Sequence, residues 1–429
     1  MSVFITLFIV CLIYFLILAF SDYDFIQPAS IVCLMCILSL LVCLLFVDKL
    51  KITLKFETIA VFLLAVFSFT IPAFLHPNKT SEIKEINSEK FYSKKIILFS
   101  LLFVILTTIL YFFQVKKVAT ALGYGGGSKY GMLFYYRNAT LHNSNNVMQY
   151  QSKWIGQLVV ADFAVAYLML IDFIKRIIYK RTKDKVSLVC HVFICLIYII
   201  QSILSGGRTQ FLYYIESFVF LLLFFYYKRN NGIIHFRIVK NLFVMILAAG
   251  ISFYALGSLT GKTHIFNFTE TLFVYFGSPV AAFDKMNRGI VEFSKLYPGC
   301  NIFYGFADSL NKLGFNIGSA NMTAPFVNIG NLSTNIYGSF ARYYFDFGVV
   351  GALIFPLLIG SIFQYAYLNL QSSESHLYLK LAIFLLCSQV MFDYCIEERF
   401  FLSVLSLGTV LRIVYIFVFY KLFETKFLV

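Results

Sequence analysis

This chain has very little charge for its length. Only 13% of its 429 residues are Asp, Glu, Lys or Arg, while 60% are hydrophobic and 19% are aromatic. So few charges cannot cover a soluble enzyme of this size with a polar surface, and that class of protein is excluded. The composition instead predicts an all-α, polytopic integral membrane protein.

The chain also lacks the charge pattern of a nucleic-acid-binding protein. Its formal net charge is +14, but the Lys and Arg residues stand in short clusters that flank apolar runs. Such clusters are typical of the signals that orient membrane proteins, so no nucleic-acid partner is expected. A cleaved signal peptide is not expected either, because no basic residue precedes the first apolar run at 3–20 and no small-residue cleavage site follows it.

Metal-binding patterns are incomplete in this sequence. Cys33 and Cys36 have the spacing of half a zinc site, but no second pair accompanies them. Asp22 and Asp24 have the carboxylate spacing that holds a divalent metal in some enzymes, yet two acids in a short polar turn are usually only solvated. The sequence therefore predicts no metal site and no cofactor.

Apolar runs of about 17 to 22 residues recur along the chain, and each can cross a hydrocarbon core of about 30 Å as a helix. We count eleven: 3–20, 28–47, 57–75, 96–115, 155–174, 186–204, 211–227, 242–260, 347–367, 380–394 and 402–420. A twelfth span or a re-entrant segment is expected in 119–136 or in 271–286, which are apolar but interrupted by Gly. The sequence thus predicts one transmembrane domain over 1–429 with 11–12 transmembrane helices.

Two basic clusters, at 175–185 and 228–240, place the turns that contain them on the cytoplasmic side. Alternation of the spans then places a first loop, 116–154, and a long polar passage, 261–346, outside. Alternation also places the N-terminus outside, whereas two acids at 22–24 followed by basic residues at 49–51 suggest an N-terminus inside. The orientation of the first three spans stays open at this point.

The strongest candidate for chemistry is Ser205-Gly206-Gly207-Arg208, in a turn of about six residues between two spans. The short turn holds a guanidinium near the headgroup plane, where the phosphates of a lipid-linked substrate lie. Arg offers a planar fork of donors suited to phosphate oxygens, and Gly206 and Gly207 let a backbone approach closely. The alternative is an interfacial turn whose Arg reaches lipid phosphates.

A second candidate is the end of the long passage, Thr334-Asn335-Ile336-Tyr337 and the residues that follow. Asn335 and Tyr337 can hydrogen-bond sugars, and Arg342 lies five residues before the span that begins near 347. We expect Asp346 to cap the beginning of that helix, where a carboxylate is favoured by the helix dipole without a catalytic role.

A third candidate is Arg137, which follows the Gly-rich stretch 123–128. This stretch matches no nucleotide-binding pattern and no strand precedes it, so a flexible external loop is the expected structure. Arg137 is the residue of this loop that can contact substrate.

Taken together, Ser-Gly-Gly-Arg between two spans, the long outer passage, Thr334-Asn335-Ile336-Tyr337 and Asp346-Phe347-Gly348 make the chain resemble the bacterial Wzy-type O-antigen polymerases. These are oligosaccharide repeat-unit polymerases. The order of spans and loops is similar over most of the chain, whereas the short motifs cover about twenty residues. The resemblance implies a GT-C-like transferase in the bacterial cell inner membrane, with an active site that faces the periplasm.

The resemblance further implies transfer of a growing glycan from undecaprenyl diphosphate onto an incoming lipid-linked repeat unit. Arg208 and Arg342 would be catalytic, because cations stabilise the departing lipid diphosphate. The substrate-binding residues would be Arg137, Gly206, Gly207, Asn335 and Tyr337. The implied partners are the undecaprenyl-diphosphate-linked oligosaccharide donor and acceptor, membrane lipids and a chain-length regulator.

Two other functions remain open on the sequence. An O-antigen ligase is a related transferase, but its family carries a His-bearing motif in the large loop that is not matched here. A lipid-linked oligosaccharide flippase or another transporter is the rival of a different class. Transporters commonly show internal repeats and a polar path at the bilayer midplane, and the sequence has neither a repeat nor a charged path.

Overall fold

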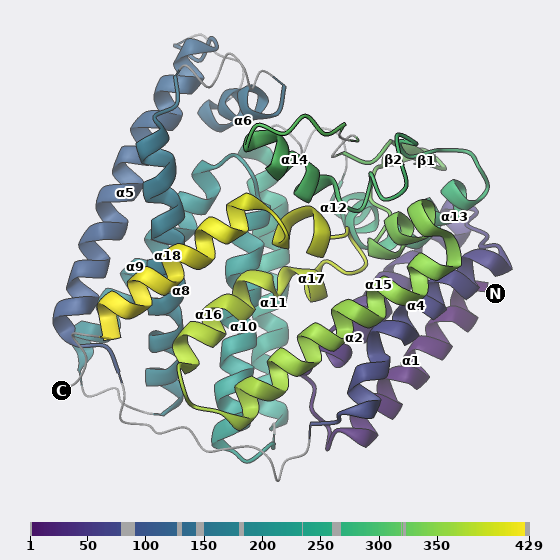
Figure 1. Cartoon of the computed structure of the whole chain (residues 1–429), viewed down its shortest axis with the longest axis horizontal. Helices are drawn as coiled ribbons and strands as arrows, with labels where there is room; N and C mark the ends of the chain where they lie inside the picture. The colour runs from purple at the N-terminus through teal and green to yellow at the C-terminus, as the bar shows by residue number, and fades with distance from the viewer. Residues whose placement is uncertain are drawn as a thin grey trace. The chain divides into compact units, whose positions relative to one another are not determined.

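The computed structural model is built almost entirely of helices (Figure 1). It describes residues 2–78, 91–126, 131–142, 150–179, 184–233, 235–259, 267–318, 320 and 323–424. Within these residues, eight helices are long and apolar enough to cross a membrane, so the chain is a multi-pass membrane protein. They are α1 (Ser2–Phe20), α2 (Pro28–Leu45), α4 (Phe56–Leu75), α5 (Lys94–Ala121), α8 (Lys153–Ile178), α9 (Lys185–Leu204), α10 (Thr209–Arg229) and α15 (Ser339–Ser372). The all-α class and eight of the eleven predicted spans are confirmed.

The other three predicted spans fall on helices of different form. The run 242–260 lies on α11 (Phe236–Leu259). The run 380–394 is divided between α16 (Leu377–Cys387) and α17 (Gln389–Phe392), which are short for a membrane crossing of about 20 residues. The run 402–420 is divided between a π-helical turn, η3 (Phe400–Val404), and α18 (Leu407–Glu424).

Contacts divide the chain into two compact units. The first comprises Met1–Lys84, Phe268–Ser373 and Leu386–Val410, and the second comprises Glu85–Asn267, Glu374–Leu385 and Leu411–Val429. Each unit is described by itself below.

In the first unit, α4 and α15 lie side by side (Figure 1). A Cβ atom at Gly360 would lie 2.2 Å from the carbonyl oxygen of Phe69, so only glycine allows the two helices to approach this closely. The rings of Phe62 and Phe340 meet edge to face 5.0 Å apart at another point of the same contact. Helix α15 kinks at Gly348, whose φ of +60° and ψ of −149° are open only to glycine.

The passage 268–338 is folded into short elements rather than an open loop. It contains α12 (Phe268–Leu272), the π-helical η2 (Phe273–Gly277), α13 (Ser278–Asn287), α14 (Tyr304–Lys312) and a hairpin of β1 (Val327–Ile329) and β2 (Leu332–Thr334). The strands are antiparallel, with Val327 opposite Thr334. The hydroxyls of Ser278 and Thr334 lie 3.0 Å apart and join η2 and α13 to the hairpin. The apolar run predicted at 271–286 therefore forms helices, and its Val280 and Phe283 are fully buried.

Contacts within the first unit show which chain segments lie at the same end. The amide of Leu54 donates to Oγ of Ser2 over 3.4 Å, and the amide of Lys55 donates to Asp284 of α13 over 2.8 Å. The beginning of α1, the turn 46–55 and the passage 268–338 therefore lie together. The N-terminus thus lies on the same side as the long passage, which agrees with the alternation of spans and disagrees with the charge pattern around α1 and α2.

The second unit contains α5, α6 (Met132–His142), α8 to α11, and most of α16 and α18. Helix α6 follows the end of α5 and packs back on it, and Tyr111 and Val115 of α5 meet Tyr136 and Ala139 of α6 in one buried cluster. The predicted outer loop 116–154 therefore begins inside α5 and contains α6. Helix α9 begins after Asp184, whose carboxylate accepts a hydrogen bond from the amide of Ser187 as an N-cap.

Candidate functional site

The side chain of Arg342, near the beginning of α15, is buried within the first unit. Only 2% of its side chain is exposed. One guanidinium nitrogen lies 3.0 Å from Oε1 of Glu397, and the other donates to the carbonyl oxygen of Asn301 over 3.2 Å. The guanidinium carbon also lies 5.5 Å from the ring centre of Phe293. The Arg342 charge is therefore compensated inside the protein.

The turn after α17 supplies the carboxylates that meet Arg342. Oε2 of Glu397 lies 3.4 Å from Arg399, and Arg399 makes a second ion pair of 2.8 Å with Asp393. The backbone carbonyls of this turn also accept from the first amides of α15, with Ser339 donating to Tyr394 over 3.0 Å. Amides at a helix beginning lack partners in the helix, so the turn both satisfies them and fixes the guanidinium.

Asp346 does not cap the beginning of a helix, and this expectation is corrected. Helix α15 begins at Ser339 and is kinked at Gly348, so its second part begins shortly after Asp346. The Asp346 carboxylate instead accepts from the amides of Asn301 and Ile302 over 3.0 and 2.8 Å, and from Nδ2 of Asn301 over 2.7 Å. It therefore holds the residues before α14 against α15.

Glu398, which the sequence did not single out, is a fully buried carboxylate in the same turn. It accepts from the amides of Phe400, Phe401 and Leu402 at the beginning of η3, and from the hydroxyl of Tyr343 over 3.1 Å. Burial raises the pKa of the Glu398 carboxyl, and the backbone amides oppose that rise. The arrangement is a structural anchor between α15 and η3.

The two predicted sugar-binding residues lie between β2 and α15. The hydroxyl of Tyr337 donates to the carbonyl oxygen of Pro325 over 2.9 Å, and its ring packs on Phe293 at 5.2 Å. Only 3% of Tyr337 is exposed, and burial raises the pKa of its hydroxyl. Asn335 is half-buried. Of this pair, Asn335 has the more accessible side chain.

In the second unit, the structure brings Gly206 against Arg137, two candidates that are distant in sequence. Gly206 is buried and has a φ of +73°, and a Cβ atom there would lie 3.0 Å from Cβ of Arg137 on α6. Gly207 is exposed. The close approach and the left-handed backbone both require glycine at position 206.

Arg208 stands at the N-cap of α10 and is half-buried. Its guanidinium carbon lies 4.2 Å from the ring centre of Phe253 on α11, and one nitrogen donates to the carbonyl oxygen of Phe253 over 3.0 Å. The stacking fixes the plane of the guanidinium. The three candidate arginines are thus divided, with Arg137 and Arg208 in the second unit and Arg342 in the first.

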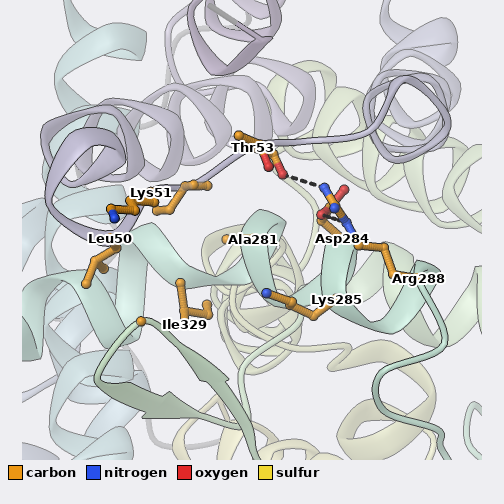
Figure 2. A pocket seen from close by; sticks show the side chains of 10 residues that line it. Leu50, Lys51, Thr53, Ala281, Asp284, Lys285, Arg288 and Ile329 are labelled. Carbon is orange, nitrogen blue, oxygen red and sulfur yellow. Dashed lines mark hydrogen bonds and ion pairs between the residues drawn. The ribbon is translucent and has the colours of Figure 1, made fainter.

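A small cationic recess, of about 60 Å³, opens in the first unit between the turn 46–55, α13 and the β-hairpin (Figure 2). Three basic side chains line it: Lys51, Lys285 and Arg288. Arg288 is compensated, because its Nε lies 2.5 Å from Asp284 and it also donates to the carbonyl oxygen of Thr53. Oδ1 of Asp284 is itself occupied by the amide of Lys55 and the hydroxyl of Thr58.

The two lysines of the recess differ from Arg288, which is paired with a carboxylate. Among the described residues, the ammonium groups of Lys51 and Lys285 have neither a hydrogen bond nor an ion pair. Lys51 follows α3 (Val47–Leu50) with a φ of +51°, and Gly330, whose φ is +60°, packs against the preceding residue, Leu50. Two uncompensated positive charges beside one recess favour an anionic ligand such as a phosphate. Sequence reasoning missed this recess because Lys51 resembles an ordinary charge flanking a span.

Comparisons with known protein families, curated proteins and solved structures find no match for this chain. Its chemistry is therefore argued from geometry. Within the part of the chain that the structure describes, no three His, Cys, Asp or Glu residues gather in the manner of a metal site. Asp22 is exposed while Asp24 is buried, so these two carboxylates do not form the metal pair that their spacing allows.

Proposed function

We propose that this protein is a membrane glycosyltransferase that polymerises lipid-linked oligosaccharide repeat units. It would transfer a growing glycan from undecaprenyl diphosphate onto the nonreducing end of an incoming lipid-linked unit. The observation that supports this proposal is the cationic recess of Lys51, Lys285 and Arg288, which lies where the turn after α2 meets the folded passage 268–338. A recess at the ends of spans suits a phosphate whose lipid chain remains in the bilayer.

The residues take different roles in this proposal. The uncompensated ammonium groups of Lys51 and Lys285 would hold a substrate phosphate, which is a point-charge contact that Lys makes well. Arg208, with Arg137 and the two glycines of its turn, would stabilise charge on the departing diphosphate. Arg342 is compensated by Glu397 and would position the beginning of α15 instead of contacting phosphate.

The proposal also includes a place for the protein in the cell. With the long passage on the periplasmic side of the inner membrane, the recess would face lipid-linked units after they have crossed the bilayer. The complete protein would then have 11–12 transmembrane helices, counting α11 and the segments from α16 to α18. A chain-length regulator would be a further partner.

A strain that lacks this gene tests the proposal by the gel pattern of its surface polysaccharide. A polymerase predicts core lipid capped with a single repeat unit. Loss of all repeat units would contradict the proposal and favour a ligase or a flippase.

Point variants in the same strain test the recess. Lys51→Gln and Lys285→Gln together should shorten or abolish polymer at normal protein level, because both uncompensated charges are lost. The matched control is Lys295→Gln, since Lys295 is exposed and its ammonium lies 2.8 Å from Glu292, outside the recess. Normal polymer from the double variant would remove the recess from the mechanism.

A further inference from the structure

Helix α14 turns its large apolar side chains away from the protein. Phe306, Leu310 and Leu313 follow one another at spacings of four and three residues, which puts them on one face of the helix. Phe306 is 53% exposed and Leu313 is 61% exposed, while Leu310 is half-buried. An exposed apolar face of this kind marks a surface that something else covers.

The side of α14 that meets the rest of the first unit carries small residues. A Cβ atom at Gly305 would lie 2.2 Å from the carbonyl oxygen of Leu402 in η3, so only glycine fits there. The hydroxyl of Ser309 accepts from the amide of Leu407 over 2.9 Å. The helix therefore lies against the beginning of the apolar segment 402–420, which the sequence predicts as a span.

The charged residues of α14 lie on another side of the helix. The carboxylate of Asp308 lies 2.6 Å from the ammonium of Lys312, one turn later. At about 100° per residue, this pair is roughly half a turn around the helix from Phe306 and Leu310. The helix is thus amphipathic, and its apolar face and its charged face both lie outside the contact with η3.

The turn after α14 holds a further ring in a fixed place. Nδ2 of Asn311 donates to the carbonyl oxygen of Ile317 over 2.9 Å, and its Oδ1 accepts from the amide of Ile317 over 2.7 Å. Within this turn, the amide of Phe315 donates to the carbonyl oxygen of Leu310 over 3.1 Å. The side chain of Phe315 is nevertheless 60% exposed. The turn therefore presents an apolar ring beside the apolar face of α14 instead of folding it inward.

The apolar face of α14 adjoins a surface that faces lipid. Helix α15 is a membrane span, and its residues Val350, Ile354 and Leu358 form an exposed apolar row at a spacing of four. Such a row on a span contacts the acyl chains of the bilayer. Phe303, directly before α14, packs on Phe355 of the same span, with 6.1 Å between the ring centres. Lipid is therefore the neighbour that this contact places beside α14.

We propose that α14 is an interfacial helix that lies in the surface of the bilayer. Its apolar face, together with the ring of Phe315, is inserted among phospholipid molecules at the boundary between headgroups and acyl chains, while its charged pair remains in water. This contact holds the folded passage 268–338 down on the membrane surface. The inference does not depend on the proposed transferase activity.

The test is quenching of tryptophan fluorescence by brominated phospholipids. The chain has a single tryptophan, so Trp154→Phe gives a background without tryptophan emission. In that background, Phe306→Trp and Phe315→Trp each place a probe on the proposed lipid face. Lys312→Trp is the matched control on the charged face of the same helix. Each full-length variant is reconstituted in phosphatidylcholine vesicles with and without bromine on the acyl chains.

We expect the probes at 306 and 315 to lose most of their emission in brominated vesicles, and the probe at 312 to lose little. Bromine near the headgroup should quench more than bromine at the chain end, since an interfacial helix is buried by only about 5–10 Å. Iodide in the water should quench in the reverse order, most strongly at 312. A probe at 306 that brominated lipid quenches no more than the probe at 312 would overturn the proposal. If iodide also fails to quench that probe, a second copy of this chain covers the face instead of lipid.

Discussion

The Arg342–Glu397 ion pair gives the sharpest prediction about the first unit. Replacing Glu397 by Leu leaves the guanidinium of Arg342 buried without the carboxylate that lies 3.0 Å from it. Replacing Arg342 by Met should lower the free energy of unfolding less, because Glu397 keeps Arg399 at 3.4 Å and is itself 31% exposed. The two single variants should therefore lose different amounts of stability, although they break the same ion pair.

The expected losses in free energy of unfolding follow from how deeply each partner of the ion pair is buried. Removing one partner of a fully buried ion pair costs about 3–5 kcal/mol. The exposure of Glu397 screens the pair, so we expect about 3 kcal/mol for Glu397→Leu and about 1–2 kcal/mol for Arg342→Met. The double variant removes the guanidinium together with the carboxylate, so its loss in free energy of unfolding should be smaller than the sum of the single losses by about 1 kcal/mol or more.

The assay is reversible unfolding in mixed detergent micelles, combined with a gel of polymer made by each variant in cells. If Arg342 positions α15, the double variant should make polymer in proportion to its folded fraction. A double variant that is stable but makes no polymer would refute this reasoning and would place Arg342 in contact with the substrate. If the two single variants lose the same amount of stability, the larger loss expected for Glu397→Leu is refuted.

Three further predictions concern other parts of the chain. Gly360→Ala should lower the free energy of unfolding by at least about 2 kcal/mol, since its Cβ atom would lie 2.2 Å from the carbonyl oxygen of Phe69. Gly250→Ala in α11 should leave the free energy of unfolding unchanged or raise it slightly, because nothing lies within 4 Å of a Cβ atom there. Unfolding in mixed micelles measures both variants. Arg208→Lys should impair polymerisation in cells without lowering protein level, because Lys cannot reproduce the planar fork that stacks on α11. Burial raises the pKa of Asp24 to about 6 from 3.8, so the contribution of Asp24 to stability should fall as pH rises from about 4 through about 6. The difference in stability between the protein and Asp24→Asn should therefore change over this pH range, as pH-resolved unfolding measures.

The sign of the pH prediction depends on the surroundings of Asp24. A raised pKa means that the folded state binds the proton more tightly than the unfolded state, so the contribution of Asp24 to stability is greatest below about pH 4 and falls above it. Besides Tyr367 of α15, which donates to the carboxylate, the titratable groups of the neighbouring segments are Asp22, Tyr23 and His76, and all three of these are exposed.

The spans could be predicted from sequence because each depends on its own composition. A run such as 57–75 is apolar on every face, so its helix needs no knowledge of the neighbours, and α4 forms there. The beginning of α15 could not be predicted in the same way. Its first amides are satisfied by a turn some 55 residues later, and the local sequence around Gly338 does not show that contact.

The candidate site was predictable only in part, for a similar reason. The turn at 205–208 stands out because glycines and a cation between two apolar runs form a local pattern. The recess has no such pattern, since Lys51 and Lys285 belong to segments that are far apart in the sequence and are joined in the fold, among other contacts, by the bonds of Asp284 and Arg288. A sequence shows that a lysine is present, but it does not show whether a carboxylate has already compensated it.

Compensation of charge separates the structural groups of this molecule from those that we propose to bind a ligand. Arg342 and Arg288 both carry a full charge, but each lies within about 3 Å of a carboxylate, so a ligand anion would gain little and would have to displace a bond already made. Lys51 and Lys285 have no carboxylate partner among the described residues. A bound anion would break no existing ion pair there, which is why we propose that a substrate phosphate binds at the recess and not at Arg342 or Arg288.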